Sequence, residues 1–319
     1  MMTLSEFLHE WNNESDVLLV HTSGSTGKPK PMYVEKKRMV ASARMTLQFL
    51  GLQPGDTSLL CMPLDYIAGK MVVVRSLEGK LQLKDVGAVG HPMADEAAGD
   101  DPIDFAAMVP LQVYNSLSVE KERRRLMNVR HLLIGGGAVD DSLSAQLSSF
   151  PHSVWSTYGM TETLSHVALR RVNGPDASEW YTLLPGVKVH SDASQCLVID
   201  APRVSASTVV THDIVEFAAN GRDFRVIGRK DHVICCGGVK IQAEEVEKRL
   251  RPYIRSPFFI GKAHDVKFGE IPVLVIESED IQYLDDVLVR VLPKYWIPKK
   301  IVSVSTLPLT ETGKPKRLL

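Results

Sequence analysis

The stretch with the most evident chemistry lies near the start of the chain, from Thr22 to Lys30, and holds four hydroxyl side chains, two glycines and two lysines. It follows an apolar run, Val17 to Val20, that is typical of a buried strand. Backbone N–H groups and hydroxyls of such a loop can turn toward phosphate oxygens, and its lysines add positive charge. The pattern is not that of a P-loop, because Thr22 stands where that loop needs glycine and Pro29 where it needs serine or threonine. Composition alone fits a phosphate-binding loop and a polar surface linker equally.

Four further segments carry glycine, hydroxyl or charged residues in distinctive short patterns. They are, in chain order, Gly135-Gly136-Gly137, Ser156 to Thr163, Thr211-His212-Asp213 with Gly228 to Asp231, and Thr310 to Lys314. Together with the first loop, they resemble the motifs of the adenylate-forming superfamily, which includes acyl-CoA synthetases, peptide-synthetase adenylation domains and luciferases. Five separated matches occur in the same order and cover nearly the whole chain. The chain is therefore identified as a member of that superfamily.

The segments between these motifs predict an α/β fold. Strand-like apolar runs alternate with amphipathic helical stretches through the first half of the chain, which favours a largely parallel sheet. The clearest helix spans residues 35–50, with apolar residues at helical spacing and Gly51 as its stop. Ligands of parallel sheets bind at the carboxyl ends of the strands. Because the loops at Thr22, Gly135 and Ser156 follow predicted strands, we expect them to converge.

Two changes of pattern divide the chain. Short β segments replace the α/β alternation from Val187 to Phe217, and a compact α+β pattern begins after Asp231. Together with the resemblance, these changes predict a large N-terminal adenylation domain, residues 1–228, with a parallel sheet and a β subdomain. A small, mobile α+β C-terminal domain, residues 232–319, would follow a hinge at residues 229–231.

The resemblance assigns most of the motif residues to ATP. Adenylation brings two anions together, since a carboxylate attacks the α-phosphate of ATP and pyrophosphate leaves, so the site needs cations and oriented donors. The β- and γ-phosphates would be held by Thr22, Ser23, Gly24, Ser25, Thr26, Gly27 and Lys28. Adenine and ribose would be bound by Gly135, Gly136, Gly137, Ser156, Thr157, Tyr158, Gly159, Asp213 and Arg229.

The resemblance implies catalytic roles for three more residues. Thr161 would contact the α-phosphate, and Glu162 would bind Mg²⁺, an ion that takes one or two carboxylates beside phosphate oxygens. Lys314 would reach between the incoming carboxylate and the α-phosphate and neutralise both. Outside the resemblance, Glu162 would be an ordinary helix-start carboxylate and Lys314 part of a solvated basic tail.

A second half-reaction is implied, in which the thiol of coenzyme A attacks the acyl-adenylate. The small domain would rotate about Asp231, removing Lys314 from the site and presenting Gly237, Gly238 and Lys240. Glycines there would let a pantetheine arm pass close to the backbone. The alternative for Gly237-Gly238 is a plain β-turn.

The acyl site is the least defined by the sequence. The chain is most similar to the short o-succinylbenzoate–CoA ligases of menaquinone synthesis, by its size and by residues 158–166. Typical superfamily members carry a longer segment ahead of the phosphate loop, so part of the usual acyl-pocket wall is expected to be absent or replaced. Asp65-Tyr66 stands where the superfamily has an aromatic residue followed by histidine, and Tyr66 is a candidate acyl contact. Because o-succinylbenzoate has two carboxylates, its pocket needs a cation for the one that does not react. The candidates are Lys70, Arg75, His166 and Arg170.

Composition limits the partners that we expect. The formal net charge of -1 over 319 residues implies no general attraction to nucleic acid or to an anionic membrane. No apolar run approaches the ~18 residues of a transmembrane helix. The cysteines, Cys61, Cys196, Cys235 and Cys236, show no disulfide-like spacing, which predicts reduced thiols and a cytoplasmic location. The expected partners are a small carboxylic acid, ATP and coenzyme A, with a homodimer possible.

Three functions remain open at this point. The first is a carboxylate–CoA ligase that releases pyrophosphate. The second is an acyl-AMP ligase that loads a carrier protein, which coenzyme A turnover would distinguish. The third is a catalytically silent nucleotide-binding module, against which the retained Lys314, Glu162, Asp213 and Arg229 argue.

Overall fold

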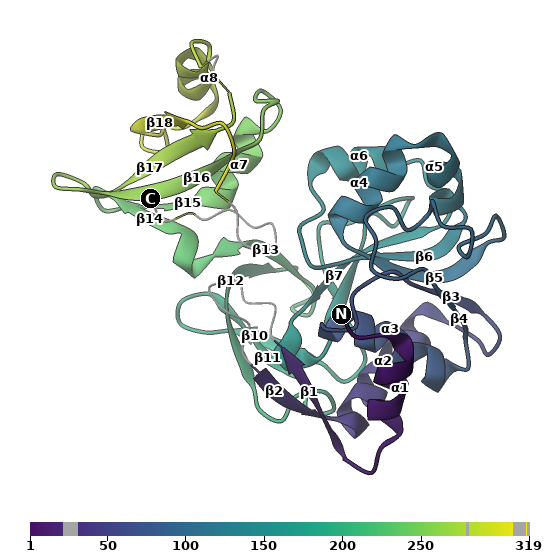
Figure 1. The fold of residues 1–319 in the computed structure, drawn as a ribbon. Coiled ribbons are helices and arrows are strands. Elements are labelled where there is room, and N and C mark those ends of the chain that lie inside the picture. Colours follow the sequence, from purple (N-terminus) through teal and green to yellow (C-terminus); the bar gives the residue numbers. More distant parts are fainter. Residues whose placement is uncertain (22–30, 279–280, 309–316, 318–319) are drawn as a thin grey trace.

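The computed structural model describes residues 1–21, 31–278, 281–308 and 317 (Figure 1). Its largest sheet has seven strands in the order β4-β3-β5-β6-β7-β8-β9. The first five strands of this order run parallel, and β8 and β9 are antiparallel to their neighbours. The strands are β3 (Thr57–Leu60), β4 (Gln82–Asp85), β5 (Ile103–Met108), β6 (Val129–Ile134), β7 (Ser153–Gly159), β8 (His166–Arg171) and β9 (Thr182–Leu183). The predicted α/β fold with a largely parallel sheet is therefore confirmed.

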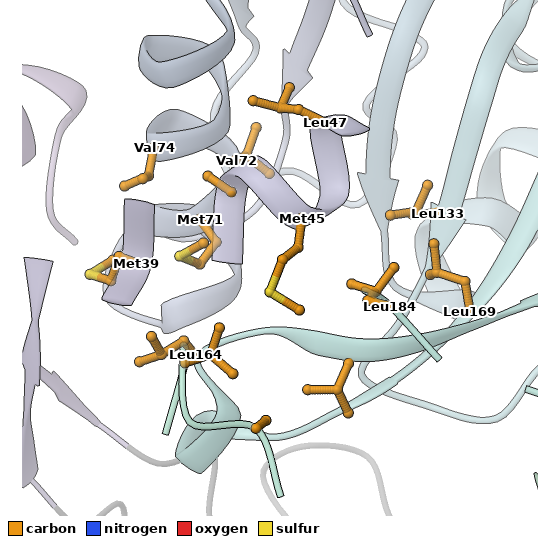
Figure 2. Packing of buried hydrophobic residues seen from close by; sticks show 14 of the residues in the cluster. Met39, Met45, Leu47, Met71, Val72, Val74, Leu133, Leu164, Leu169 and Leu184 are labelled. Atoms are coloured by element: carbon orange, nitrogen blue, oxygen red, sulfur yellow. The ribbon is translucent and has the colours of Figure 1, made fainter. Parts of the chain in front are cut away.

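Helices cover both faces of this sheet, because successive strand residues point to opposite sides. Leu133 packs into the apolar cluster of α2 (Lys36–Leu50) and α3 (Ile67–Gly79), whereas Leu132 and Ile134 pack against the other face. Figure 2 shows side chains of α2 and α3 meeting beside Leu133 and Leu169. The other face is covered by α4 (Pro110–Ser118), α5 (Glu120–Met127) and α6 (Asp141–Leu147).

Helix boundaries follow local sequence signals where these are strong. The helix predicted for residues 35–50 is α2, and Gly51 ends it in the left-handed region at φ 68°, as glycine at a helix C-terminus favours. Helix α1 (Leu4–Asn12) was not predicted. It begins at Thr3 with a capping box that includes Glu6, and it buries Phe7 against the α2–α3 layer.

Two smaller β units flank the large sheet. Strands β1 (Val17–His21) and β2 (Pro31–Glu35) pair antiparallel across the predicted phosphate loop. A four-stranded antiparallel sheet follows later in the chain and corresponds to the predicted short β segments. Its strands are β10 (Lys188–Ser191), β11 (Cys196–Asp200), β12 (Val209–Phe217) and β13 (Phe224–Arg229).

The C-terminal part has its own sheet, which stands apart from the seven-stranded sheet in Figure 1. Its elements are β14 (Val233–Cys236), β15 (Val239–Gln242), α7 (Ala243–Leu250), β16 (Phe258–Asp265), β17 (Gly269–Ile276), α8 (Leu284–Val291) and β18 (Lys300–Ser303). The apolar clusters of this part contain residues 234–307 only, and those of the preceding part contain residues 2–224 only. We therefore retain residues 229–231 as the proposed junction.

Two further observations concern the whole described chain. None of its helices is both long enough and apolar enough to cross a membrane. The four cysteines all lie in the described part and are free thiols.

The strand order of the large sheet reverses at one place. From β3 the chain moves to β4 on one side and then to β5 on the other side of β3. At such a switch point the connections leave in opposite directions, so a crevice opens at the carboxyl ends of the two strands. The ends of β3 and β5 are therefore where the fold favours a ligand.

Gly69 shapes the wall of this crevice. A Cβ atom at Gly69 would lie closer than 3.0 Å to the Pro63 and Met62 carbonyl oxygens, in backbone that follows β3. We predict that Gly69→Ala lowers the free energy of unfolding by about 1–3 kcal/mol, because backbone must shift to admit the methyl group. Thermal and denaturant unfolding measure this change. The control is Gly90→Ala, whose Cβ would meet only the Asn115 amide at 3.4 Å. Equal stability of the two variants would contradict the close approach.

Candidate active site

A cavity of about 540 Å³ lies at the switch point of the large sheet. Residues at the end of β3, Cys61 to Pro63, and at the end of β5, Ala107 to Val109, form part of its wall. This volume suits a small organic ligand. The fold has therefore placed a cavity where its topology favours one.

Predicted nucleotide contacts line the same cavity. They are Gly135, Gly136, Thr157, Gly159 and Thr161. A Cβ atom at Gly135 would lie 2.5 Å from Thr157 Oγ1, so a larger residue at this position would force the Thr157 side chain to move. Gly136 has a positive φ of 76°, which glycine adopts without strain. Segments distant in sequence thus meet at one wall.

Tyr158 turns away from the cavity and toward Asp213. Its hydroxyl donates to Asp213 Oδ2 at 2.6 Å, and Arg229 Nη1 donates to Asp213 Oδ1 at 3.1 Å. Burial, followed by the Asp213 charge, raises the pKa of Tyr158 far above its usual range, so the phenol stays neutral. The structure therefore brings Tyr158, Asp213 and Arg229 together. In a complex with ATP, ribose hydroxyls would donate to Asp213 beside Tyr158 and Arg229 or in their place.

Aromatic rings support this corner. Tyr158 lies edge-on to Phe224 with 5.1 Å between ring centroids, and Tyr181 stacks on Phe224 at 5.6 Å. The Ser156 and Tyr181 hydroxyls share a hydrogen bond of 2.9 Å. Ser156 therefore supports the aromatic group, and its predicted adenine contact stays a prediction. Gly137 lies beside Pro110, where an added Cβ atom would be crowded at 3.2 Å from the proline Cγ.

Thr161 and Glu162 lie in one short turn, η1 (Thr161–Thr163). Thr161 is buried at the cavity wall, whereas Glu162 is exposed and has no ion pair with any described residue. An exposed carboxylate next to the predicted α-phosphate contact fits Mg²⁺, because phosphate oxygens and water supply most of its ligands. No group of three or more His, Cys, Asp or Glu side chains suited to a metal occurs among the described residues. Glu162 stays the proposed ligand.

The predicted hinge residue is held at the junction by two side chains. Asp231 Oδ2 accepts from Arg229 Nη2 at 2.7 Å, and Asp231 Oδ1 lies 2.9 Å from His212 Nδ1. Arg229 thus bridges Asp213 and Asp231. Burial acts to raise the pKa of Asp231, but the hydrogen bonds from Arg229 and His212 and the Arg229 charge together lower it, so this carboxyl is ionised.

Gly237 and Gly238 form the two-residue turn between β14 and β15. Their φ values, 56° and 83°, are both positive, as the tight turn of a β-hairpin requires. Turn geometry accounts for both glycines without a ligand. Lys240 is exposed on β15. The coenzyme A contacts of these three residues stay a prediction.

Two groups of predicted residues lie outside the described part of the chain. They are the phosphate loop, including Thr22, Ser23, Gly24, Ser25, Thr26, Gly27 and Lys28, and the tail with Lys314. His21, the last described residue before that loop, lines the cavity and bridges to Tyr66, which is also at the cavity wall.

The four candidate cations of the acyl site have different surroundings. Lys70 is buried against α1, where its Nζ lies 3.8 Å from Glu10 and 5.1 Å from the centre of the Phe7 ring. Arg170 donates to the Ser178 carbonyl oxygen and lies over the Tyr181 ring. Both therefore have structural contacts away from the cavity. His166 and Arg75 line the cavity.

Arg75 is a buried cation without a counter-charge among the described residues. Its side chain is 2% exposed, and its guanidinium carbon lies 6.0 Å from the Phe105 ring centre. It donates to Ser165 Oγ, and its Nε has no hydrogen-bond partner among the described residues. No carboxylate of the described chain pairs with it. Burial lowers the pKa of Arg75 to about 9, which leaves it charged at neutral pH.

Ser165 and Gln112 line the cavity and were not predicted as site residues. The Gln112 amide donates to the Cys61 and Val89 carbonyl oxygens, and so joins the end of β3 to the segment that follows β4. A sequence signal existed for Arg75, because it is the one charged residue in the apolar run from Met71 to Leu77. No comparable signal marks Ser165 or Gln112.

Comparison with known proteins agrees with this geometry. The model of the family described as AMP-binding enzyme matches residues 5–194. The chain belongs to the AMP-binding enzyme family. A solved structure described as an acyl-CoA synthetase (AMP-forming)/AMP-acid ligase II-like protein from Dyadobacter fermentans is 36% identical, with a TM-score of 0.68 over 98% of this chain and 91% of that one. The superfamily identification is thereby confirmed.

Other relatives are more distant in sequence. The 2-succinylbenzoate–CoA ligases of Salmonella typhimurium and Listeria monocytogenes are each 27% identical, over 84% and 98% of this chain. This chain spans 59% and 71% of their lengths. The o-succinylbenzoate coenzyme A synthetase of Bacillus subtilis, solved with ATP and magnesium ion, is 21% identical with a TM-score of 0.76 over 94% of this chain and 68% of that one. At 21% identity, the similarity to this structure shows a shared fold and no more.

Asp213 provides a test of the nucleotide corner. We predict that Asp213→Asn raises the dissociation constant for ATP about tenfold, because a carboxylate that accepts from ribose hydroxyls becomes a neutral amide. Calorimetric titration with ATP measures this constant. Asp200→Asn, at the exposed end of β11, is the charge-matched control and should bind ATP as the unaltered protein does. Equal affinities for both variants would exclude Asp213 from the nucleotide site.

Proposed function

We propose that this chain is an ATP-dependent carboxylate–CoA ligase that forms an acyl-adenylate and releases pyrophosphate. Membership of the AMP-binding enzyme family supports the adenylation step. The names of the relatives, which are acid–CoA ligases, support coenzyme A as acceptor. We further propose an acid of the 2-succinylbenzoate type as substrate.

The observation that carries the choice of substrate is Arg75. A buried guanidinium without a counter-charge in the described chain is unfavourable unless a ligand supplies one. Arg75 lines the same cavity as Thr157 and Thr161, which belong to the proposed nucleotide side. An acid with two carboxylates would place one near the α-phosphate and the other at Arg75. Lys70 and Arg170 have other contacts, so they are weaker candidates.

The chain's own residues would divide the work as follows. Thr161 would orient the α-phosphate, and Asp213 with Arg229 would hold the ribose. Arg75 would hold the second carboxylate, so that the first is presented to the α-phosphate at a fixed distance. Magnesium bound at Glu162 would supply positive charge at the phosphates. Lys314 would neutralise the two anions as the new bond forms.

Cellular setting and assembly are further proposals. Free thiols at all four cysteines support a reducing compartment, and we propose the cytoplasm. The predicted homodimer stays a prediction, which the mass of the protein in solution would test.

Pyrophosphate release tests the proposed function. The purified protein is given ATP, Mg²⁺ and a panel of carboxylic acids that includes 2-succinylbenzoate and 4-oxo-4-phenylbutanoate, the same acid without the ring carboxylate. Release should depend on the acid and be fastest with 2-succinylbenzoate. Binding of ATP without acid-dependent release would favour a silent nucleotide-binding module instead.

Lys314 should act in the first half-reaction only. We predict that Lys314→Ala lowers the rate of adenylate formation by about 100-fold or more, because a cation placed at the developing charge is lost. Thioester formation from supplied acyl-adenylate and coenzyme A should continue. Lys316→Ala is the matched control, with a neighbouring lysine removed. Equal loss of both half-reactions in Lys314→Ala would contradict its assigned role.

Arg75 should set the preference for a second carboxylate. We predict that Arg75→Met raises the KM for 2-succinylbenzoate by about 10–100-fold, since a charged hydrogen bond is lost, while the KM for ATP is unchanged. The melting temperature should stay or rise, because an uncompensated buried charge is removed. Arg170→Met is the control and should leave the KM for 2-succinylbenzoate unchanged. A large loss of stability in Arg75→Met, without a change in KM, would make Arg75 a structural residue.

A further inference from the structure

A row of polar side chains leads from Arg75 along the cavity wall to Thr46 and Ser42 of α2. Arg75 Nη2 donates to Ser165 Oγ, and Ser165 Oγ lies 3.3 Å from His166 Nδ1. His166 Nε2 lies 2.9 Å from Thr46 Oγ1, which in turn lies 3.3 Å from the Ser42 carbonyl oxygen within α2. Arg75, His166, Thr46 and Ser42 are at most 8% exposed. Buried polar atoms need hydrogen-bond partners.

The chemistry of the row determines the direction of its hydrogen bonds. A guanidinium can only donate, so Ser165 Oγ accepts from Arg75 and has its proton free for His166 Nδ1. His166 then carries its proton on Nε2 and donates to Thr46, whose hydroxyl donates to the Ser42 carbonyl oxygen. If Nδ1 of His166 carried the proton instead, the Thr46 hydroxyl would donate to His166 Nε2. The Ser42 carbonyl oxygen would then lose its hydrogen bond from Thr46. The arrangement therefore favours a neutral His166 with Nε2 protonated.

The surroundings of His166 agree with a neutral ring. Burial, followed by the Arg75 charge, lowers the pKa of His166 well below its usual range. His166 therefore does not supply the positive charge for which it was a candidate. Its Nδ1 faces the Ser165 hydroxyl.

Backbone geometry adds a second constraint on Ser165. Leu164, the residue before it, has a positive φ of 65° and is 2% exposed. A left-handed backbone is unfavourable for leucine, so its packing must hold it there. The turn thereby places Ser165 next to Arg75 and His166 next to Thr46 of α2.

We propose that His166 is a positioning residue for the acid site, which it serves by fixing the Ser165 hydroxyl and through it the Arg75 guanidinium. This inference rests on the proposed function, because the selected ligand is the second carboxylate of the acid. With Ser165 on Nη2 and the Phe105 ring beside the guanidinium, Arg75 is held in one orientation. His166 thus contributes to substrate selection without touching substrate.

The test compares the selectivity of variants. Selectivity is the ratio of kcat/KM for 2-succinylbenzoate to kcat/KM for 4-oxo-4-phenylbutanoate. His166→Leu, which cannot accept from Ser165, should lower this ratio about tenfold. His166→Asn, whose side-chain oxygen can accept from Ser165, should recover most of it. Thr46→Val, of nearly the same shape as threonine, should lower it about threefold. These changes correspond to the loss or weakening of one hydrogen bond to a charged group.

A matched control separates positioning from general destabilisation. Ser58→Ala removes a buried hydrogen bond of 2.7 Å to Ser76, the neighbour of Arg75 on α3, without touching the row. It should leave the selectivity ratio unchanged even if the melting temperature falls. An equal fall of the ratio in Ser58→Ala and His166→Leu would overturn the inference.

A spectroscopic measurement tests the inference independently of turnover. Nitrogen NMR of ¹⁵N-histidine-labelled protein at pH 7 should show a neutral imidazole with Nε2 protonated, assigned by its loss in His166→Leu. A protonated ring, or a ring with Nδ1 protonated, would overturn the inference. Failure of the proposed function looks different: the unaltered protein would then release no pyrophosphate with either acid. Unaltered selectivity in all three row variants would refute the positioning role alone.

Discussion

A guanidinium buried without a counter-charge in the described part of the chain is the constraint on which the rest of the site depends. Removing Arg75 from water is costly. Within the described chain, only a contact with the Phe105 ring and one hydrogen bond to Ser165 offset this cost. The charge is retained because burial does not lower its pKa below the neutral range. The protein therefore holds a fixed positive charge at the wall of an otherwise mostly apolar cavity. In the proposed function, the second carboxylate of the acid supplies the missing counter-charge.

The fold supplies the place for this charge. Parallel strands reverse their order between β3 and β5, and the cavity opens at that point. Helix α3 follows the end of β3 directly and carries Arg75 two turns from its start. Gly135 and Gly159 also line this cavity, and at Gly159 a Cβ atom would lie closer than 3.0 Å to the backbone of Ser165 and His166. In the proposed function, one cavity thus receives the nucleotide beside Gly135 and Thr161 and the second carboxylate of the acid at Arg75.

The sequence marked residues of the cavity wall around Gly135 more clearly than it ranked the candidate cations of the acid site, for a physical reason. Gly135 lies too close to Thr157 for a larger residue to fit without a shift, and Gly136 has a positive φ, so residue type alone points to this motif. Arg75 could not be chosen over Lys70 or Arg170 because all are cations, and only burial and partners separate them. The partnership of Tyr158 with Asp213 also needed coordinates, since the two residues are distant in the chain. The capped helix α1 was missed although Thr3 and Glu6 form a recognisable capping box.

The most direct measurement of the central claim is the position of the second carboxylate in a crystal structure of the protein with the adenylate of 2-succinylbenzoate. We predict that this carboxylate lies within hydrogen-bonding distance of the Arg75 guanidinium, with Ser165 still accepting from Nη2. A carboxylate that points to solvent, or that pairs with Lys70 or Arg170 while Arg75 keeps its present contacts, would contradict it.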